Sequence, residues 1–193
     1  MILLGIIGKK ESGKDTVYSI IKEAIHPKTC IRIGFADSLK EEIAVAINAV
    51  NAFYGRPQSD KIDKNYIDEH KNSFRLILQG WGTDFRRNLV SKDYWINRVL
   101  QKLASLSNDY YIVVVPDVRF KNEATMIKSA GGYLIKINRH NVPVYLDAHP
   151  SEREMDSIEN IDQIIENNDT IDSLKIKTKL TLSILLNGSK HKI

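Results

Sequence analysis

The sequence predicts an α/β protein in which a parallel sheet is covered by helices on both faces. Three observations indicate this class. Short apolar runs alternate with segments whose apolar residues recur at helical spacing. The first apolar run leads through a glycine-containing turn into one of these amphipathic segments. The chain of 193 residues, with 42% hydrophobic and 27% charged residues, has the size and composition of one soluble globular domain.

Five apolar runs are predicted to be β-strands. ILLGII, at residues 2–7, is rich in isoleucine, as is typical of a strand buried on both faces. YYIVVV, at 110–115, has the clearest strand pattern, and Pro116 and Asp117 are expected to end it. The complete set of predicted strands is 2–7, 30–35, 110–115, 133–137 and 161–167.

Helices are predicted between the strands, where apolar residues recur every three or four positions. The predicted helices are 17–25, 39–50, 74–89, 96–103, 123–129 and 171–185, and the polar, aperiodic stretch 54–72 is expected to be a mobile flap. Gly131 and Gly132 form a natural stop for the helix before them. Ligands of such folds bind beyond the carboxyl ends of the strands, so the site is expected in the loops after residues 7, 35, 115, 138 and 167.

Composition narrows the class of function. The net charge of +4 suits an anionic ligand, but lysines and arginines are scattered among acids, so no nucleic-acid partner is expected. No stretch approaches about 20 consecutive apolar residues, and the N-terminus lacks the basic region of a signal peptide, so no membrane association is expected. The single cysteine, Cys30, excludes an internal disulfide and a thiolate metal cluster and indicates a reducing cytoplasm.

GKKESGKDT, at residues 8–16, has the frame of a phosphate-binding loop, G-x-x-x-x-G-K. The loop lies between a predicted buried strand and an amphipathic helix, where backbone N–H groups and the helix N-terminus converge on an anion. The alternative is a glycine-rich turn without a ligand. The residues expected to bind the phosphates are Gly8, Lys9, Lys10, Ser12, Gly13, Lys14, Asp15 and Thr16.

Asp15 stands where the usual pattern has serine or threonine. A carboxylate is compatible with a triphosphate when Mg²⁺ lies between them, because carboxylates are good ligands for this hard cation. The negative charge also complements the dipole of the following helix in its first turn. Thr16 can still offer a hydroxyl to a phosphate oxygen. The loop is therefore interpreted as an ATP site.

A second group of motifs is expected to bind the acceptor. In FADSLK, at 35–40, Asp37 suits an acceptor hydroxyl and Lys40 a phosphate, although Asp37 or Ser38 is also a common helix cap. Four polar residues spaced by four form one helical stripe: Arg75, Gln79, Thr83 and Arg87. Two guanidinium groups suit a monophosphate and the amide suits a base edge. Gly80 and Gly82 cost helix stability and suggest close approach of another group.

Two further loops carry charged residues at strand ends. In PDVRFKNEA, at 116–124, Asp117 is expected to position Mg²⁺ and Arg119 to face the transferred phosphate, whereas Asn122 and Glu123 are equally good helix caps. Arg139 begins a loop that is interpreted as a lid supplying this arginine to the transition state. Asp147 and His149 in that loop suggest a zinc site, but the other histidines lack partner spacing, so zinc is disfavoured.

These motifs together resemble the bacteriophage-type deoxynucleoside monophosphate kinases. That family carries GKD in its loop and shows F-A-D-x-L-K, R-x-x-L-Q-x-x-G-T-[DE]-x-x-R, D-V-R-F-x-N-E and D-x-H-x-S-E. This chain has FADSLK, RLILQGWGTDFRR, DVRFKNE and DAHPSE in the same order, and Trp95 stands at a family tryptophan. The departures are Ser73-Phe74, where Thr-Pro is expected, and an extra arginine, Arg86. Both fall near the polar stripe that is expected to bind the acceptor.

The resemblance implies a P-loop NTPase fold of the nucleoside monophosphate kinase type, with three layers and a five-stranded parallel sheet flanked by helices. It implies one domain over 1–193, with a mobile acceptor-binding helical region at about 38–105 and a lid at about 139–152. ATP with Mg²⁺ would be the donor and a 2′-deoxynucleoside monophosphate the acceptor. The resemblance also suggests a homodimer, in the host cytoplasm if the chain is phage-encoded.

Each motif residue receives an expected role. The catalytic residues are Lys14, Arg119 and Arg139, and the metal-binding residues are Asp15 and Asp117. The residues expected to bind the acceptor are Asp37, Lys40, Arg75, Gln79, Thr83, Arg87, Trp95, Glu123, His149, Ser151 and Glu152. Three alternatives stay open: a kinase for another small phosphorylated acceptor, such as phosphomevalonate, a nucleic-acid-dependent ATPase, and a non-catalytic nucleotide sensor.

Overall fold

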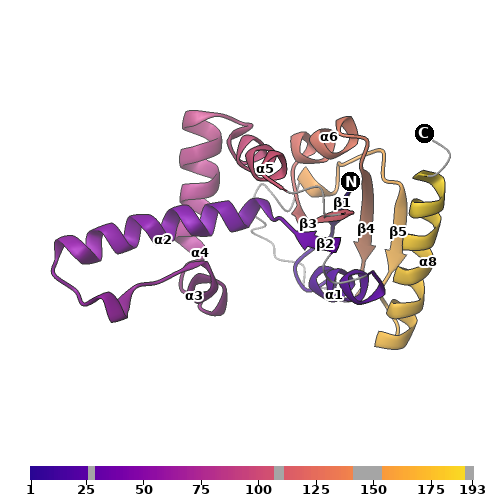
Figure 1. The fold of residues 1–193 in the computed structure, drawn as a ribbon, viewed down its shortest axis with the longest axis horizontal. Coiled ribbons are helices and arrows are strands. Elements are labelled where there is room, and N and C mark those ends of the chain that lie inside the picture. The colour runs from indigo at the N-terminus through magenta and orange to yellow at the C-terminus, as the bar shows by residue number, and fades with distance from the viewer. Residues whose placement is uncertain (26–28, 107–110, 141–153, 190–193) are drawn as a thin grey trace. The chain divides into compact units, whose positions relative to one another are not determined.

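The computed structural model describes residues 1–25, 29–106, 111–140 and 154–189 (Figure 1). The chain divides into two compact units. The first, here called the α/β unit, consists of Met1–Ile33 and Leu106–Ile193, and the second, the helical unit, is Gly34–Ser105. The range 38–105 that was predicted to bind the acceptor falls within the helical unit, and its role and mobility stay predictions.

The α/β unit contains a five-stranded sheet in the order β2-β3-β1-β4-β5, and every neighbouring pair is parallel. The prediction of a parallel sheet is confirmed. β1 is central, since it pairs with β3 on one side and β4 on the other. The strands are β1 (Ile2–Ile7), β2 (Cys30–Arg32), β3 (Ile112–Val118), β4 (Tyr133–Asn138) and β5 (Gln163–Glu166).

Several strand boundaries differ from the prediction, most clearly those of β2 and β3. β2 ends at Arg32, and Phe35 is already the first residue of helix α2 (Phe35–Phe53). The Asp37 carboxylate accepts a hydrogen bond from Gly34 N–H at 2.9 Å, and this cap starts the helix early. β3 continues through Pro116 to Val118, because the register between β1 and β3 shifts there and accommodates a residue without an N–H group.

Helices cover both faces of the sheet (Figure 1). α1 (Lys14–Ala24) and α8 (Ile171–Ser189) share a buried cluster with strand residues such as Leu4, Ile6 and Ile135. α6 (Lys121–Ser129) covers the opposite face, where a β-carbon on Gly5 would lie 2.5 Å from Ile127 Cδ1. In the part of the chain that the structure describes, no helix has the length and apolar character needed to cross a membrane.

The end of α6 confirms the predicted glycine stop. Gly131 has a φ of +73° and donates a hydrogen bond to Lys128 O, while Gly132 N–H donates to Ile127 O at 2.9 Å. This pair of bonds is the Schellman arrangement, which satisfies carbonyl groups of the last helical turn. Gly132 must also be small, since a β-carbon there would lie 2.6 Å from Leu3 O. The two glycines therefore turn the chain directly into β4.

The helical unit packs around a small core of Ile43, Ala44 and Ile67. Ile67 lies on α3 (Lys64–Glu69), so the stretch 54–72, which was predicted to be an aperiodic flap, contains a regular helix with a buried residue, while its mobility stays a prediction. Asp63 caps this helix by accepting a hydrogen bond from Tyr66 N–H at 2.8 Å. The remaining elements are the short turn η2 (Gln58–Asp60), α4 (Arg75–Gln79), η3 (Gly80–Val90) and α5 (Tyr94–Ala104).

The helix predicted at 74–89 changes its winding halfway. η3 has the wide π-helical form, and Ser91 N–H donates to Arg86 O, five residues earlier. The predicted apolar stripe assumed one α-helical period throughout. In the structure Phe85 is 42% and Leu89 76% exposed, because the wider turns rotate these positions away from the core. π-helical turns occur frequently at functional sites.

Candidate active site

The loop between β1 and α1 has the geometry that the glycine motif predicts. Gly13 has a φ of +99° and forms the N-cap of α1. A β-carbon on Gly8 would lie 2.5 Å from Ser12 Oγ and 3.0 Å from Ile137 O. Gly13 is therefore required by its backbone conformation and Gly8 by the space inside the loop. The loop closes tightly in front of the helix N-terminus, where an anion is favoured.

The interior of the loop presents polar groups suited to a phosphate. Lys14 Nζ donates hydrogen bonds to Gly8 O and Lys9 O, both at 2.5 Å, so its ammonium group lies across the loop. Ser12 is 1% exposed, and its hydroxyl forms no hydrogen bond with any described residue. An unsatisfied buried hydroxyl costs about 1–3 kcal/mol. A ligand oxygen in the loop would remove that cost.

The candidate metal ligands are carboxylates at two places in the α/β unit. Asp15 is exposed in the first turn of α1, next to the half-buried Thr16, and Asp117 is half-buried near the end of β3. Among the described residues, no cluster of three or more acidic, histidine or cysteine side chains could hold a metal by itself. Mg²⁺ is commonly bound by one or two carboxylates together with substrate phosphates. The donor set therefore fits Mg²⁺ that arrives with a nucleotide.

The loop after β3 is organised by Glu123. This residue is 1% exposed, and its Oε2 accepts hydrogen bonds from Arg119 N–H at 2.7 Å and Phe120 N–H at 3.1 Å. Glu123 thus caps α6, as one of the two sequence interpretations expected. The cap fixes the backbone that carries the half-buried Arg119. The predicted contacts of Arg119 and Glu123 with substrate stay predictions.

Arg139, at the end of β4, contacts the phosphate loop. Its Nη1 donates a hydrogen bond to Glu11 O at 3.0 Å. Glu11 has a φ of +64°, which turns its backbone into the left-handed region. The structure therefore brings Arg139 together with the glycine loop. The other residues predicted for the lid, Asp147, His149, Ser151 and Glu152, lie outside the described residues.

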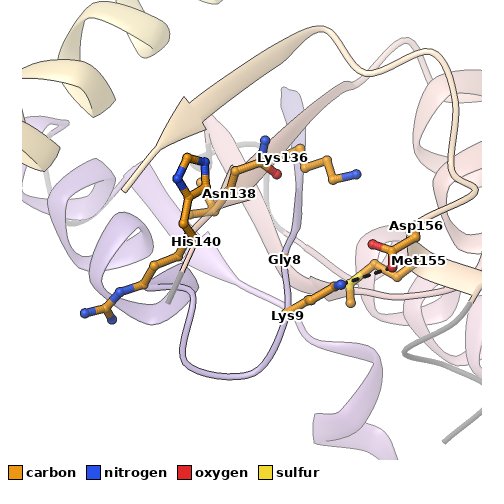
Figure 2. Close-up of a pocket in the computed structure, with 9 residues that line it drawn as sticks. Gly8, Lys9, Lys136, Asn138, His140, Met155 and Asp156 are labelled. Carbon is orange, nitrogen blue, oxygen red and sulfur yellow. Dashed lines mark ion pairs between the residues drawn. The ribbon is translucent and has the colours of Figure 1, made fainter. Parts of the chain in front are cut away.

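A cavity of about 210 Å³ lies beside the first glycine of the loop (Figure 2). Lys9 Nζ pairs with Asp156 Oδ2 at 3.1 Å, while Lys10 Nζ lies 3.7 Å from Glu11 Oε1. Sequence reasoning missed Asp156 and Lys136, although a lysine inside the apolar strand YLIKIN was an available signal. The lining residues are Gly8, Lys9, Lys136, Ile137, Asn138, Arg139, His140, Met155 and Asp156.

In the helical unit, Lys40 is paired with carboxylates. Its Nζ lies 2.5 Å from Asp68 Oδ1 and 3.9 Å from Asp37 Oδ1, and its side chain is 5% exposed. Asp37 also caps α2, so the structure gives it the alternative role that the sequence allowed. Asp68 was missed because the stretch around it was interpreted as a flap. Any acceptor phosphate at Lys40 must therefore compete with the Asp68 carboxylate.

The predicted polar stripe runs from the surface into the helical unit. Arg75 is exposed, Gln79 and Thr83 are half-buried, and Arg87 is 8% exposed. Arg87 Nη1 donates a long hydrogen bond of 3.3 Å to Lys92 O. The stripe thus spans α4 and η3 and presents its two guanidinium groups in different environments. Its contact with an acceptor stays a prediction.

The two glycines of η3 have different surroundings. A β-carbon on Gly82 would lie 2.9 Å from Leu39 Cδ2, which confirms the predicted close approach of another group. At Gly80 the nearest atom to such a β-carbon is Asp84 Oδ2 at 4.0 Å, so no described protein group makes the predicted close approach there. Trp95 is 3% exposed and donates from its indole nitrogen to Gly82 O at 2.9 Å. Trp95 therefore packs α5 against η3.

The extra arginine, Arg86, is held by a network centred on Glu42. Arg86 forms an ion pair with Glu42, and Trp81 Nε1 and Tyr94 Oη donate to the same carboxylate at 3.3 Å and 3.1 Å. The guanidinium group lies over the rings of Trp81, Phe85 and Tyr94. Burial, with the hydrogen bond to Glu42 as the second cause, raises the pKa of Tyr94 above its usual value. Arg86 thus joins η3 to α2 and α5.

Comparison with known proteins identifies the family. The family model for deoxynucleotide monophosphate kinase matches residues 52–178. A "Putative deoxynucleotide monophosphate kinase" from Acanthamoeba polyphaga mimivirus is 34% identical over 183 residues, which cover 89% of this chain and 91% of that protein. The crystal structure of a gluconokinase from Sinorhizobium meliloti 1021 has a TM-score of 0.50 at 14% identity, covering 99% of this chain and 97% of that one, and so shares the fold. A dephospho-CoA kinase from Campylobacter jejuni has a TM-score of 0.47 at 14% identity, covering 96% and 98%. The chain belongs to the deoxynucleotide monophosphate kinase family.

Proposed function

We propose that this kinase transfers the terminal phosphoryl group of ATP to a 2′-deoxynucleoside monophosphate and releases ADP and the deoxynucleoside diphosphate. The observation that carries the proposal is the loop from Gly8 to Thr16, in which Lys14 crosses the loop interior and the buried Ser12 hydroxyl has no partner among the described residues. In a member of this family, such a loop is the natural site for the donor phosphates.

The donor is bound mainly by the loop. Backbone N–H groups at its end and at the N-terminus of α1 donate hydrogen bonds to the phosphate oxygens, and Lys14 exchanges its carbonyl partners for these oxygens. Arg139 leaves Glu11 O and turns to the phosphates of the bound donor. Mg²⁺ would be held by Asp15 or Asp117, together with the phosphates, and would neutralise part of their charge.

The acceptor is bound by the helical unit. Arg75 and Arg87 hold its phosphate, since two guanidinium groups match a phosphate dianion, while Gln79 and Thr83 contact the sugar or base. Lys40 reaches the acceptor phosphate only after it separates from Asp68. This competition makes acceptor binding dependent on the position of α3.

The chemistry needs positioning and charge neutralisation more than it needs a base. The acceptor phosphate oxygen is already ionised, so it forms a bond to the terminal phosphorus while the bond from that phosphorus to the bridging oxygen breaks. The bridging oxygen leaves as part of ADP. Lys14, Arg119 and Arg139 stabilise the negative charge that spreads over the transferred group.

ADP production, coupled to a colour change and measured with each of the four deoxynucleoside monophosphates and their ribose counterparts, tests the substrate class. Turnover is expected with at least one deoxynucleotide. Turnover with phosphomevalonate, in the absence of turnover with every nucleotide, would contradict the proposed acceptor. The homodimer suggested by the resemblance is a separate proposal, and light scattering of the purified chain tests it.

Lys14→Ala tests the donor site. We expect kcat to fall by about 10³-fold, because the variant loses a cation that neutralises the transferred group, while acceptor affinity changes less than about twofold. Lys22→Ala, on the exposed side of the same helix, is the matched control and keeps full activity. Turnover of Lys14→Ala close to that of the control would reject the assignment of the loop.

A further inference from the structure

Asn167 connects the phosphate loop to the carboxyl ends of two strands. It follows β5, and its backbone N–H donates to Asn138 O, at the end of β4, at 2.8 Å. Its side-chain Nδ2 donates to Ser12 O, in the loop, at 2.8 Å. The half-buried Asn167 side chain therefore holds a carbonyl group 155 residues away in sequence.

This contact depends on the glycine at position 13. A β-carbon on Gly13 would overlap the Asn167 amide nitrogen, so only glycine leaves room for the hydrogen bond. Glycine, however, is also the residue with the greatest backbone freedom. A partner outside the loop is therefore needed to hold the peptide between Ser12 and Gly13 in one orientation. Asn167 is the described residue whose side chain does so.

The geometry of a peptide bond gives this contact a consequence for binding. The described chain contains no cis peptide, and in a planar trans peptide the C=O and N–H groups point in opposite directions. Because Asn167 holds the Ser12 carbonyl group on one side, Gly13 N–H points to the other. No described residue accepts a hydrogen bond from this N–H group. It is a fixed donor that is left for a ligand.

We infer that Asn167 is a positioning residue that orients the Ser12–Gly13 peptide so that Gly13 N–H donates to a phosphate of the bound donor. The inference rests on the proposed function of the loop. Without the Asn167 amide, the peptide can rotate and turn the Ser12 carbonyl oxygen towards the anion. This rotation replaces a donor with an acceptor at the phosphate and weakens donor binding.

Asn167→Ala and the nearly isosteric Asn167→Asp test the inference. Removal of the amide donor is expected to lower kcat/KM for ATP by about tenfold and to weaken the Kd for ADP by a similar factor. The KM for the acceptor should change less than about twofold. Asn167→Asp should be at least as impaired, since it places a carboxylate oxygen against Ser12 O. Should Asn167→Ala fail to fold, Asn167→Asp provides the same comparison.

Asn168→Ala is the matched control. The neighbouring Asn168 bonds only to His140 N–H and Glu166 among the described residues, so its replacement should leave both nucleotide constants unchanged. A purely structural role for Asn167 would lower the melting temperature and the active fraction without changing KM for ATP, and this result would overturn the inference. If Lys14→Ala loses activity while both Asn167 variants match the control, the inference alone fails. If Lys14→Ala is also active, the proposed donor site fails.

Discussion

The candidate sites in the two units of this kinase consist of different kinds of chemical group. In the α/β unit the candidate donor site consists largely of backbone groups of the phosphate loop. Their positions are fixed by Gly8, Gly13 and the register of β1. In the helical unit the candidate groups are side chains, and one of them, Lys40, is already paired with the Asp68 carboxylate. The backbone of the candidate donor site is thus set by the fold, whereas Lys40 would have to exchange an ion pair for its proposed contact with the acceptor.

This difference predicts different responses to mutation. A backbone site is sensitive to any change that alters a dihedral angle or fills the space next to a glycine. A site made of paired side chains responds in both stability and affinity, because removal of one partner leaves the other unpaired. The following predictions test this comparison, beginning with the largest expected effect.

Gly13→Ala should damage the backbone site most severely. The new side chain must adopt a φ of +99°, which costs roughly 1–2 kcal/mol, and its β-carbon displaces Asn167 from Ser12 O. We expect kcat/KM for ATP to fall by at least about 100-fold. Gly131→Ala is the control, since that residue also has a positive φ, of +73°, but has open space around it. It should lose stability and keep its KM for ATP. An unchanged kcat/KM in Gly13→Ala would contradict the backbone site.

Glu42→Ala should destabilise the helical unit. Glu42 and Arg86 are 18% and 22% exposed, and the change leaves Arg86, Trp81 and Tyr94 without their shared acceptor. We expect a loss of about 2–4 kcal/mol in the free energy of unfolding, measured by urea denaturation. Glu41→Ala removes a more exposed ion pair with Lys102 and should cost less than about 1 kcal/mol. Equal losses of unfolding free energy in the two variants would show that the Glu42 network stabilises the protein no more than an exposed ion pair does.

Asp68→Asn separates the structural and binding roles of Lys40. If Lys40 contacts the acceptor phosphate, removal of the competing carboxylate should lower the acceptor KM by about threefold, and Lys40→Met should raise it by about tenfold. Asp60→Asn, an exposed change on η2, is the control. Stability losses in both Lys40 and Asp68 variants, with an unchanged acceptor KM, would assign Lys40 a structural role only.

Tyr94 gives the smallest expected effect, and it depends on pH. The pKa of its hydroxyl is raised above 10.0, mainly by burial and then by the bond to Glu42, so the folded state favours the neutral phenol. Its contribution to stability is therefore complete below the unfolded pKa and is lost as pH rises through the folded value. Melting temperatures from about pH 8 to about pH 11 should fall more steeply in the parent than in Tyr94→Phe. Parallel curves would contradict this prediction.

Most of the fold could be predicted from the sequence because its signals are local. The five strands and most of the helices follow from the periodicity of neighbouring residues, and the phosphate loop follows from glycines a few positions apart. The errors occurred where a local pattern was overridden by packing. Residues 64–69 fold because Ile67 is buried in the unit's core, and Leu89 is exposed because η3 winds more widely than an α-helix.

The sequence by itself determined the sheet, the loop and the family motifs, because each is encoded in residues that are close together in the chain. Only the tertiary structure decided which side chains are partners. Asn167 reaches Ser12 across 155 residues and Arg86 reaches Glu42 across 44. No periodicity records such contacts, since they depend on where separate elements bring their side chains. The same contacts decide whether a charged residue is available to a substrate or is already bound within the protein.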